Sequence, residues 1–219
     1  MSFALIGPGK LGRVLFQAAA GPRLVIGRSP EGLEPFRDRA ELGISTRLAD
    51  AARCQVAAAA VPAAACGQVF ADLCPQLPAG HILLNFATGW DIPRELVEQY
   101  PRLHLLNVKL VGSAIGISHG LKGLAVVART SGGVLEQIGR CLPGLELTVG
   151  DPLAVRDINT RATRAALAAA VALEKELAAQ NFAAPVIRAA AGCLMPGVMI
   201  AYQNGELGAF AQKIVDELR

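Results

Sequence analysis

The sequence lacks any concentration of charge of one sign. Its 21 basic and 18 acidic residues leave a formal net charge of +3, and no run of Lys or Arg gathers the positive charge in one place. Proteins that bind duplex nucleic acid carry such a cluster as an electrostatic footprint. We therefore expect no nucleic-acid partner, and any affinity for an anion must come from a few local cations.

Cysteine and histidine are also too sparse and too scattered for a cross-linked or metal-bound scaffold. The five cysteines are odd in number and contain no C-x-x-C pair, which argues against a disulfide framework and against a zinc site. We interpret them as small buried hydrophobic residues. The three histidines, His81, His104 and His119, have no repeated spacing, so we expect no metal site and assign none of them a catalytic role.

Long uninterrupted apolar runs are missing as well. The least charged stretch, from Cys54 to Ala71, is broken by Pro62 and Gly67, which favours a strand, a turn and a helix over a membrane span. No basic leader precedes the apolar run that begins at Phe3, so we expect no signal peptide. These features predict a cytoplasmic protein with no membrane partner. The apolar share of 53% predicts a globular chain with a large core.

Short apolar runs alternate with segments of helical period through roughly the first two-thirds of the chain. This alternation predicts an α/β fold with a doubly wound, Rossmann-type parallel sheet. We expect a helix from about Lys10 to Ala20 and a second helical stretch that ends near Gly43. The expected strands are 3–6, 23–27, 56–61, 81–86, 103–108, 124–128 and 145–149.

The last part of the sequence has a different character. Gly150-Asp151-Pro152 marks a boundary, so we predict a Rossmann domain over 1–150 and a small all-helical domain over 151–219. Ala154 to Gln180 contains no glycine or proline and should form one helix of about seven turns.

Asn181 offers a stop for that long helix. Pro185 and Pro196 should then divide the remainder into a shorter helix and a final helix that starts at about Gly197.

One glycine-rich segment stands in the setting that dinucleotide binding requires. Gly7-Pro8-Gly9-Lys10-Leu11-Gly12 lies between a predicted strand and a predicted helix, as the G-x-G-x-x-G pattern demands. Gly7 would allow the tight turn, Gly9 the close approach of a pyrophosphate, and Gly12 the close packing of helix on strand. The helix N-terminus would hold the pyrophosphate. An ordinary turn is the alternative interpretation.

The residues after the second expected strand bear on which dinucleotide is bound. A carboxylate there would hold the ribose hydroxyl of NAD, but this chain has Gly27-Arg28-Ser29-Pro30 and no carboxylate before Glu31. Arg28 can pair with a 2′-phosphate and Ser29 can donate a hydrogen bond to it. The pattern therefore favours NADP, with a solvated loop arginine as the alternative.

At these residues the sequence resembles the superfamily of pyrroline-5-carboxylate reductase and the deazaflavin-dependent NADP reductases. The resemblance lies in A-L-I-G-P-G-K-L-G (4–12), G-R-S-P-E (27–31) and A-A-V-P (59–62). It implies that Arg28 and Ser29 hold the adenosine ribose phosphate and that Val61 and Pro62 lie beside the nicotinamide ribose. It also implies pairing of two chains through their helical domains, which complete the substrate pocket at their junction.

Polar residues at the carboxyl ends of the expected strands are the candidates for chemistry, since ligands bind there in parallel sheets. Thr88, which follows one such strand, is assigned to the cofactor site, and Asn107 and Lys109 follow the next. The ammonium of Lys109 could polarise a carbonyl or imine, and the alternative is a lysine that reaches the surface. Asn159 shares a face of the long helix with Thr163 and is the third candidate, unless it only caps or solvates the helix.

These observations predict an NADPH-dependent oxidoreductase that transfers hydride to a small carbonyl or imine or to a flavin-like partner. The alternative is an NADP-binding redox sensor or regulatory protein without turnover. Residues 151–219 are too few to enclose a core, yet their helices are largely apolar, so we expect a homodimer built through them. A monomer whose helices fold back on the sheet is the competing arrangement.

Overall fold

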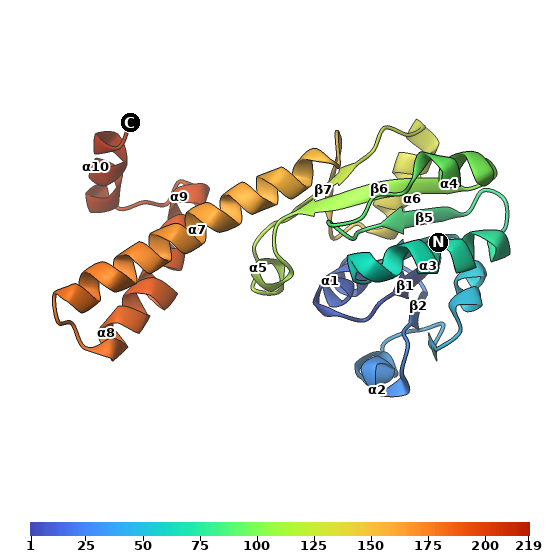
Figure 1. Cartoon of the computed structure of the whole chain (residues 1–219), viewed down its shortest axis with the longest axis horizontal. Coiled ribbons are helices and arrows are strands. Elements are labelled where there is room, and N and C mark those ends of the chain that lie inside the picture. The colour runs from blue at the N-terminus through green and yellow to red at the C-terminus, as the bar shows by residue number, and fades with distance from the viewer. The chain divides into compact units, whose positions relative to one another are not determined.

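The chain forms two compact units. The computed structural model describes all residues from Met1 to Arg219 and separates Met1–Asn159 from Thr160–Arg219 (Figure 1). We expected a boundary at Gly150, but the units divide inside helix α7 (Ala154–Ala179). The start of α7 belongs to the first unit because Val155 is fully buried and the Asn159 side chain donates to the Leu110 carbonyl at 2.9 Å.

An eight-stranded sheet forms the centre of the first unit, in the order β3-β2-β1-β4-β5-β6-β7-β8. This order contains the 3-2-1-4-5-6 arrangement of a Rossmann sheet, which confirms the predicted fold class. The strands are β1 (Phe3–Ile6), β2 (Arg23–Ile26), β3 (Ile44–Ser45), β4 (Val56–Ala59), β5 (Ile82–Asn85), β6 (His104–Val111), β7 (Leu124–Val127) and β8 (Glu146–Val149).

We predicted a parallel sheet, but one pair of strands in the observed sheet is antiparallel. Strands β6 and β7 run antiparallel, with Val108 opposite Val127. The segment between them holds only the short helix α5 (Ala114–Ser118). A parallel pair needs a crossover connection, usually a full helix that spans the sheet, and α5 is too short for that.

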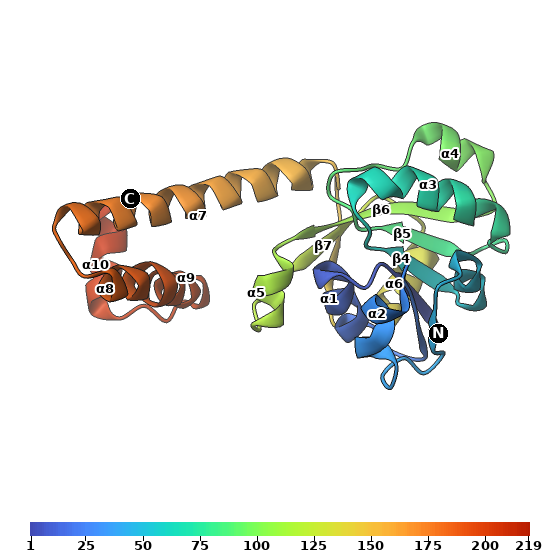
Figure 2. The same ribbon diagram turned by 60° about the horizontal axis from the view of Figure 1, so that its bottom comes forward.

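Helices cover both faces of the sheet (Figure 2). Alternate strand residues serve the two faces, so Phe3 and Leu5 pack under one layer while Ala4 and Ile6 pack under the other. The first layer holds α1 (Lys10–Ala18), α2 (Pro30–Leu33) and α6 (Gly132–Cys141), and the second holds α3 (Ala63–Leu73) and α4 (Arg94–Gln99). Three short 3₁₀ segments, Glu34–Phe36, Leu48–Arg53 and Cys74–Gln76, complete the unit.

The helical stretch predicted to end near Gly43 is mostly absent. Only α2 and the adjoining 3₁₀ turn form, because Pro35 has no backbone N–H and its ring obstructs a continuing helix. The chain then turns and enters β3, a two-residue strand that the sequence pattern did not predict.

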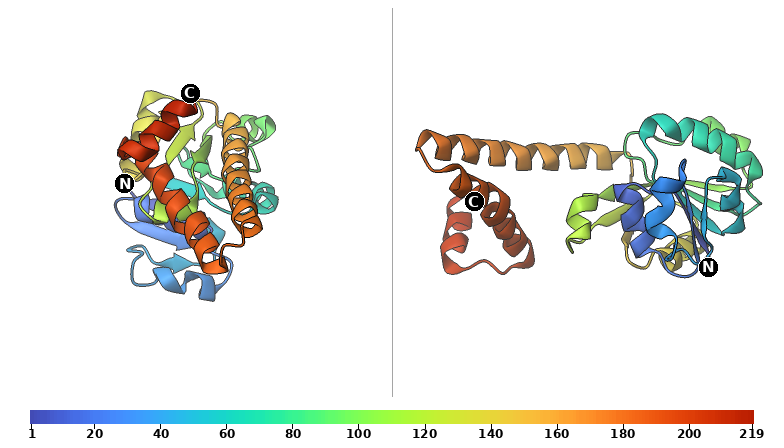
Figure 3. Two further views of the ribbon diagram at one scale, coloured as in Figure 1. Left: turned by 90° about the vertical axis from the view of Figure 1, so that its left-hand side faces the viewer. Right: turned by 90° about the horizontal axis from the view of Figure 1, so that it is seen from below.

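The second unit is entirely helical. Helix α7 runs uninterrupted for 26 residues, as predicted (Figure 3). It ends at Ala179, and Asn181 follows with a left-handed φ of 60°. The Asn181 N–H donates to the Ala178 carbonyl at 3.0 Å and the Phe182 N–H to the Leu177 carbonyl at 3.1 Å. This Schellman pattern satisfies the last carbonyls and confirms Asn181 as the stop.

Pro196 does not break the following helix, contrary to our expectation. Helix α8 (Ala184–Ala189), a π-helical segment (Ala190–Leu194) and α9 (Met195–Asn204) follow one another directly. The wider π turn accommodates the missing donor of Pro196 without ending the helix. A further helix, α10 (Ala209–Glu217), follows Gly205.

By length and composition, the stretch Ala184–Asn204 is apolar enough to cross a membrane, with a hydropathy of 1.6 in its most apolar window. Soluble helices also pass this test, so it is weak evidence for a span. No residue of the second unit is buried.

Candidate functional site

A cavity of about 640 Å³ opens where the strand order reverses between β1 and β4. Ligands of doubly wound sheets bind at this switch point, outside the carboxyl ends of the strands. Residues that follow β1, β2 and β4 line it. Six of the predicted cofactor residues are among them: Gly7, Pro8, Gly9, Arg28, Val61 and Pro62.

The three glycines of the loop differ in how much space surrounds them. Gly7 has a φ of +97°, and a Cβ there would lie 2.6 Å from the Ala60 carbonyl oxygen. A Cβ on Gly12 would lie 2.0 Å from the Gly7 oxygen, so only glycine lets α1 pack this close to β1. A Cβ on Gly9, in contrast, would meet nothing within 4 Å. Gly9 therefore leaves open space at the wall of the cavity.

The N-terminus of α1 lies next to that open space. The helix begins at Lys10, and neither a side-chain cap nor an acidic residue satisfies its first N–H groups. These free donors and the positive end of the helix dipole favour an anion. Lys10, Leu11 and Gly12 do not line the cavity themselves.

Arg28 and Ser29 both follow β2, but only Arg28 lines the cavity. Arg28 is exposed and lines the cavity, whereas Ser29 stands at the N-cap of α2 and does not line it. Hydrogen bonds from the Glu31 backbone N–H and from the Ser29 hydroxyl lower the pKa of the Glu31 carboxyl. Arg28 is thus the cation presented to a ligand at this end.

Several lining residues were not predicted from the sequence. Thr46 and Leu48 follow β3, and Ala64, Ala65 and Val69 come from α3. The apolar Ile44 directly after Gly43 was the one available signal for the first pair. The residues of α3 gave no signal beyond their small size.

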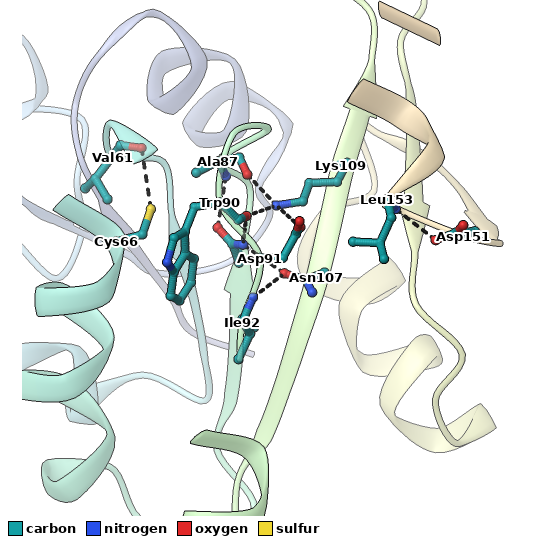
Figure 4. A network of polar contacts seen from close by, with 11 residues as sticks. Val61, Cys66, Ala87, Trp90, Asp91, Ile92, Asn107, Lys109, Asp151 and Leu153 are labelled. Atoms are coloured by element: carbon teal, nitrogen blue, oxygen red, sulfur yellow. Dashed lines mark hydrogen bonds and ion pairs between the residues drawn. The ribbon is translucent and has the colours of Figure 1, made fainter. Parts of the chain in front are cut away.

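A buried polar network lies beside the cavity, at the carboxyl end of β5 (Figure 4). Lys109 was expected after the end of a strand or at the surface, but it lies within β6 and is only 1% exposed. Its Nζ donates to the carbonyls of Ala87 and Trp90 and lies 3.2 Å from Asp91 Oδ1. Burial lowers the pKa of the Lys109 ammonium, and the hydrogen bond to the Asp91 carboxylate opposes that shift.

Two asparagines extend this network. The Asn85 Nδ2 group donates to the Trp90 carbonyl and to Asn107 Oδ1, both at 2.8 Å. Asn85 Oδ1 accepts from the Ala87 N–H at 3.0 Å, and Asn107 Oδ1 accepts from the Ile92 N–H at 3.2 Å. The sequence analysis did not identify Asn85 as a site residue. The only sign of its role was a polar residue at the end of an apolar strand.

The structure brings Asn107 and Lys109 into one network, and Asn159 bonds to Leu110 next to them on β6. Thr88 lies in the loop between β5 and α4 and does not line the cavity. The tip of this loop approaches the start of α3, since a Cβ on Gly89 would lie 3.3 Å from Ala63 Cβ.

The fold is similar to that of several solved structures. Pyrroline-5-carboxylate reductase from Coxiella burnetii is similar over 99% of this chain and 84% of its own, with 12% identity and a TM-score of 0.74. The Plasmodium falciparum pyrroline carboxylate reductase with NADP bound is similar over 100% of this chain and 84% of its own, with 12% identity and a TM-score of 0.70. An imine reductase from a Pseudomonas species is similar over 94% of this chain and 78% of its own, with 17% identity and a TM-score of 0.67.

No family model and no curated protein matches the sequence. At these identities the structural likeness shows the fold and leaves the activity to be argued from the site.

Proposed function

We propose that this chain is an NADPH-dependent oxidoreductase that transfers hydride to a small carbonyl or imine substrate. The observation that carries the proposal is the open space at Gly9, which lies at the strand-order reversal and next to the uncapped start of α1. A dinucleotide pyrophosphate fits the donors and the space found there. When bound, the nicotinamide supplies the hydride, and the protein orients the reactants.

Arg28 makes NADP the preferred dinucleotide in this proposal. Its guanidinium lines the cavity where a 2′-phosphate would lie, and it can pair with that phosphate through two hydrogen bonds. Ser29 would contribute its hydroxyl only by turning from Glu31 to the phosphate. Val61 and Pro62 line the cavity on the far side of the glycine loop, the position proposed for the nicotinamide ribose.

The substrate end of the site lies beyond Pro62, where the β5–α4 loop approaches α3. We expected Thr88 at the cofactor site, but it does not line the cavity. We therefore propose Thr88 on this loop and Asn107 below it as the polar contacts for a carbonyl or imine. Asn159 stays a predicted substrate contact. Its Nδ2 group already donates to the Leu110 carbonyl, which leaves its Oδ1 atom for that contact. Two of the similar structures are pyrroline carboxylate reductases and one is an imine reductase, which supports an imine as the first substrate class to test.

A steady-state assay of NADPH oxidation against cyclic imines, keto acids and a deazaflavin tests the proposal. We expect turnover with at least one imine or keto acid. Tight NADPH binding by calorimetry without turnover on any acceptor would contradict the enzyme proposal and favour a redox sensor. Turnover with the deazaflavin alone would replace the small substrate by a flavin-like partner.

We also propose that the protein is a cytoplasmic homodimer joined through the helices of Thr160–Arg219. Large apolar side chains are exposed there, including Leu194 at 66% and Phe210 at 82%. A second copy would remove this apolar surface from water. Sedimentation at micromolar concentration should show twice the 22.8 kDa chain mass. A single species at the monomer mass, or recovery of the protein only with membranes, would contradict the dimer.

A further inference from the structure

Every hydrogen-bond donor of the Lys109 ammonium is already engaged. An ammonium has three N–H donors and no acceptor. Lys109 Nζ has three acceptors, the carbonyls of Ala87 and Trp90 and the Asp91 carboxylate. No donor is left for a substrate carbonyl, imine or carboxylate.

The three acceptors belong to a single loop, Ala87–Asp91, which connects β5 to α4 (Figure 4). Asn107 and Lys109 are two residues apart on β6 and so point to the same face of the sheet. Asn107 holds the end of the loop through the Ile92 N–H, and Asn85 holds its start through the Ala87 N–H. The loop is therefore fixed from two neighbouring strands, with Lys109 at its centre.

The position of this loop matters for the cavity. Gly89, at its tip, approaches Ala63, which directly follows the cavity-lining Pro62. A shift of the loop would therefore move Thr88 and Gly89 relative to the start of α3. The Gly7–Gly9 and Ile26–Arg28 segments, which line another part of the cavity, make no hydrogen bond with the loop.

A cation inside the protein is retained only where its interactions offset the cost of removing it from water. Lys109 is 1% exposed, whereas its partner Asp91 is 48% exposed. Two of the three acceptors are uncharged carbonyls, so the cost of burying the ammonium is best offset when all three hydrogen bonds form together. The three bonds form together when the loop holds the position seen in the structure.

We propose that Lys109 is a positioning residue that fixes the Ala87–Asp91 loop, and Thr88 with it, at the substrate end of the cavity without touching the substrate. This inference rests on the proposed reductase function. Loss of the ammonium should slow hydride transfer through a displaced loop and leave cofactor affinity unchanged.

The test compares Lys109→Met, which keeps most of the length of the side chain and removes its charge, with Lys122→Met. Lys122 is exposed and makes no hydrogen bond or ion pair with the loop. For Lys109→Met we expect faster hydrogen exchange over residues 86–93, an NADPH affinity by calorimetry within about threefold of wild type, and a kcat lower by about a hundredfold with KM for NADPH unchanged. Lys122→Met should change none of these.

Unchanged exchange over residues 86–93 in a folded Lys109→Met protein would overturn the proposal, even if kcat fell, because the ammonium would then act on substrate directly. An unchanged kcat with a loosened loop would overturn it as well. If Lys109→Met does not fold, Asp91→Ala removes one acceptor at a half-exposed position and leaves both carbonyl contacts. Faster loop exchange with a reduced kcat is expected there, and no change in either quantity would overturn the proposal.

Failure of the proposed function would be separable from failure of this inference. If the wild-type protein turned over no substrate, the reductase proposal would fall. Hydrogen exchange and NADPH titration need no turnover and would still decide whether Lys109 fixes the loop.

Discussion

The two units of this chain use similar apolar side chains in opposite ways. Met1–Asn159 buries the central strands of its sheet and carries the cavity, whereas Thr160–Arg219 has no buried residue. Leu73 on α3 is fully buried, and Leu194 in the second unit is 66% exposed. The stability of the first unit therefore comes from within the chain, and the second unit presents surface that the chain itself does not cover.

The architecture explains this difference. A sheet offers two broad apolar faces, and helices on both sides close a core around them. The second unit has only helices, and a domain of about 60 residues buries a smaller share of its surface than a larger domain does. Helical propensity and caps, such as that at Asn181, are then enough to define the helices but not to enclose a core.

The largest effect should come from Gly9→Val, which tests whether cofactor binding belongs to the first unit. The added Cβ meets no protein atom within 4 Å, so folding should be preserved while the side chain fills the open space. We expect loss of NADPH and NADH binding by calorimetry. Gly67→Val on α3 is the matched control, since a Cβ there also meets nothing within 4 Å. Normal cofactor affinity in Gly9→Val would remove the glycine loop from the site.

The same truncation placed in each unit tests the contrast in burial. Leu73→Ala should lower the free energy of unfolding by about 2–5 kcal/mol at any protein concentration, because it opens a cavity in the core. Leu194→Ala should have an effect only where the dimer is populated. Urea unfolding at several protein concentrations measures both. Equal, concentration-independent losses would mean that Leu194 is packed within its own chain.

His81 makes the first unit sensitive to acid. Its side chain is buried, both ring nitrogens lack a partner, and burial lowers its pKa from 6.5 to about 4. The unfolded chain binds a proton below pH 6.5 that the folded chain does not, so this stability is present above pH 6.5 and is lost as the pH falls toward 4. The loss should approach about 3 kcal/mol.

Trp90, the single tryptophan of the chain, reports unfolding of the first unit by fluorescence. Urea unfolding between pH 7 and 4.5 should show the loss in wild type and much less of it in His81→Leu. An identical pH dependence in the two proteins would place the acid sensitivity elsewhere.

The parts of the fold that could be predicted from the sequence are those governed by local pattern. Strands β1, β2, β4 and β5 are buried on both faces and so appear as continuous apolar runs. The glycine loop and α7 follow from residue type alone. The antiparallel turn from β6 to β7 and the continuation of the helix through Pro196 depend on chain geometry that composition does not encode.

Of the candidate site, part of the cavity lining could be predicted from the sequence, and the network around Lys109 could not. Gly7, Gly9 and Arg28 line the cavity as predicted, since backbone constraint and charge are visible in the residue type. The burial of Lys109 depends on carbonyls 19 and 22 residues away in the chain. Any residue has a carbonyl, so the sequence held no sign of this contact.

The central claim is that the first unit binds NADPH and recognises its 2′-phosphate through Arg28. Calorimetric titration of Arg28→Ala with NADPH and with NADH tests it most directly. Loss of one charge-assisted contact should weaken NADPH binding by about 1.5–3 kcal/mol, or roughly one to two decades in affinity, and leave NADH binding nearly unchanged. Equal weakening of both cofactors, or no change in either, would contradict the account.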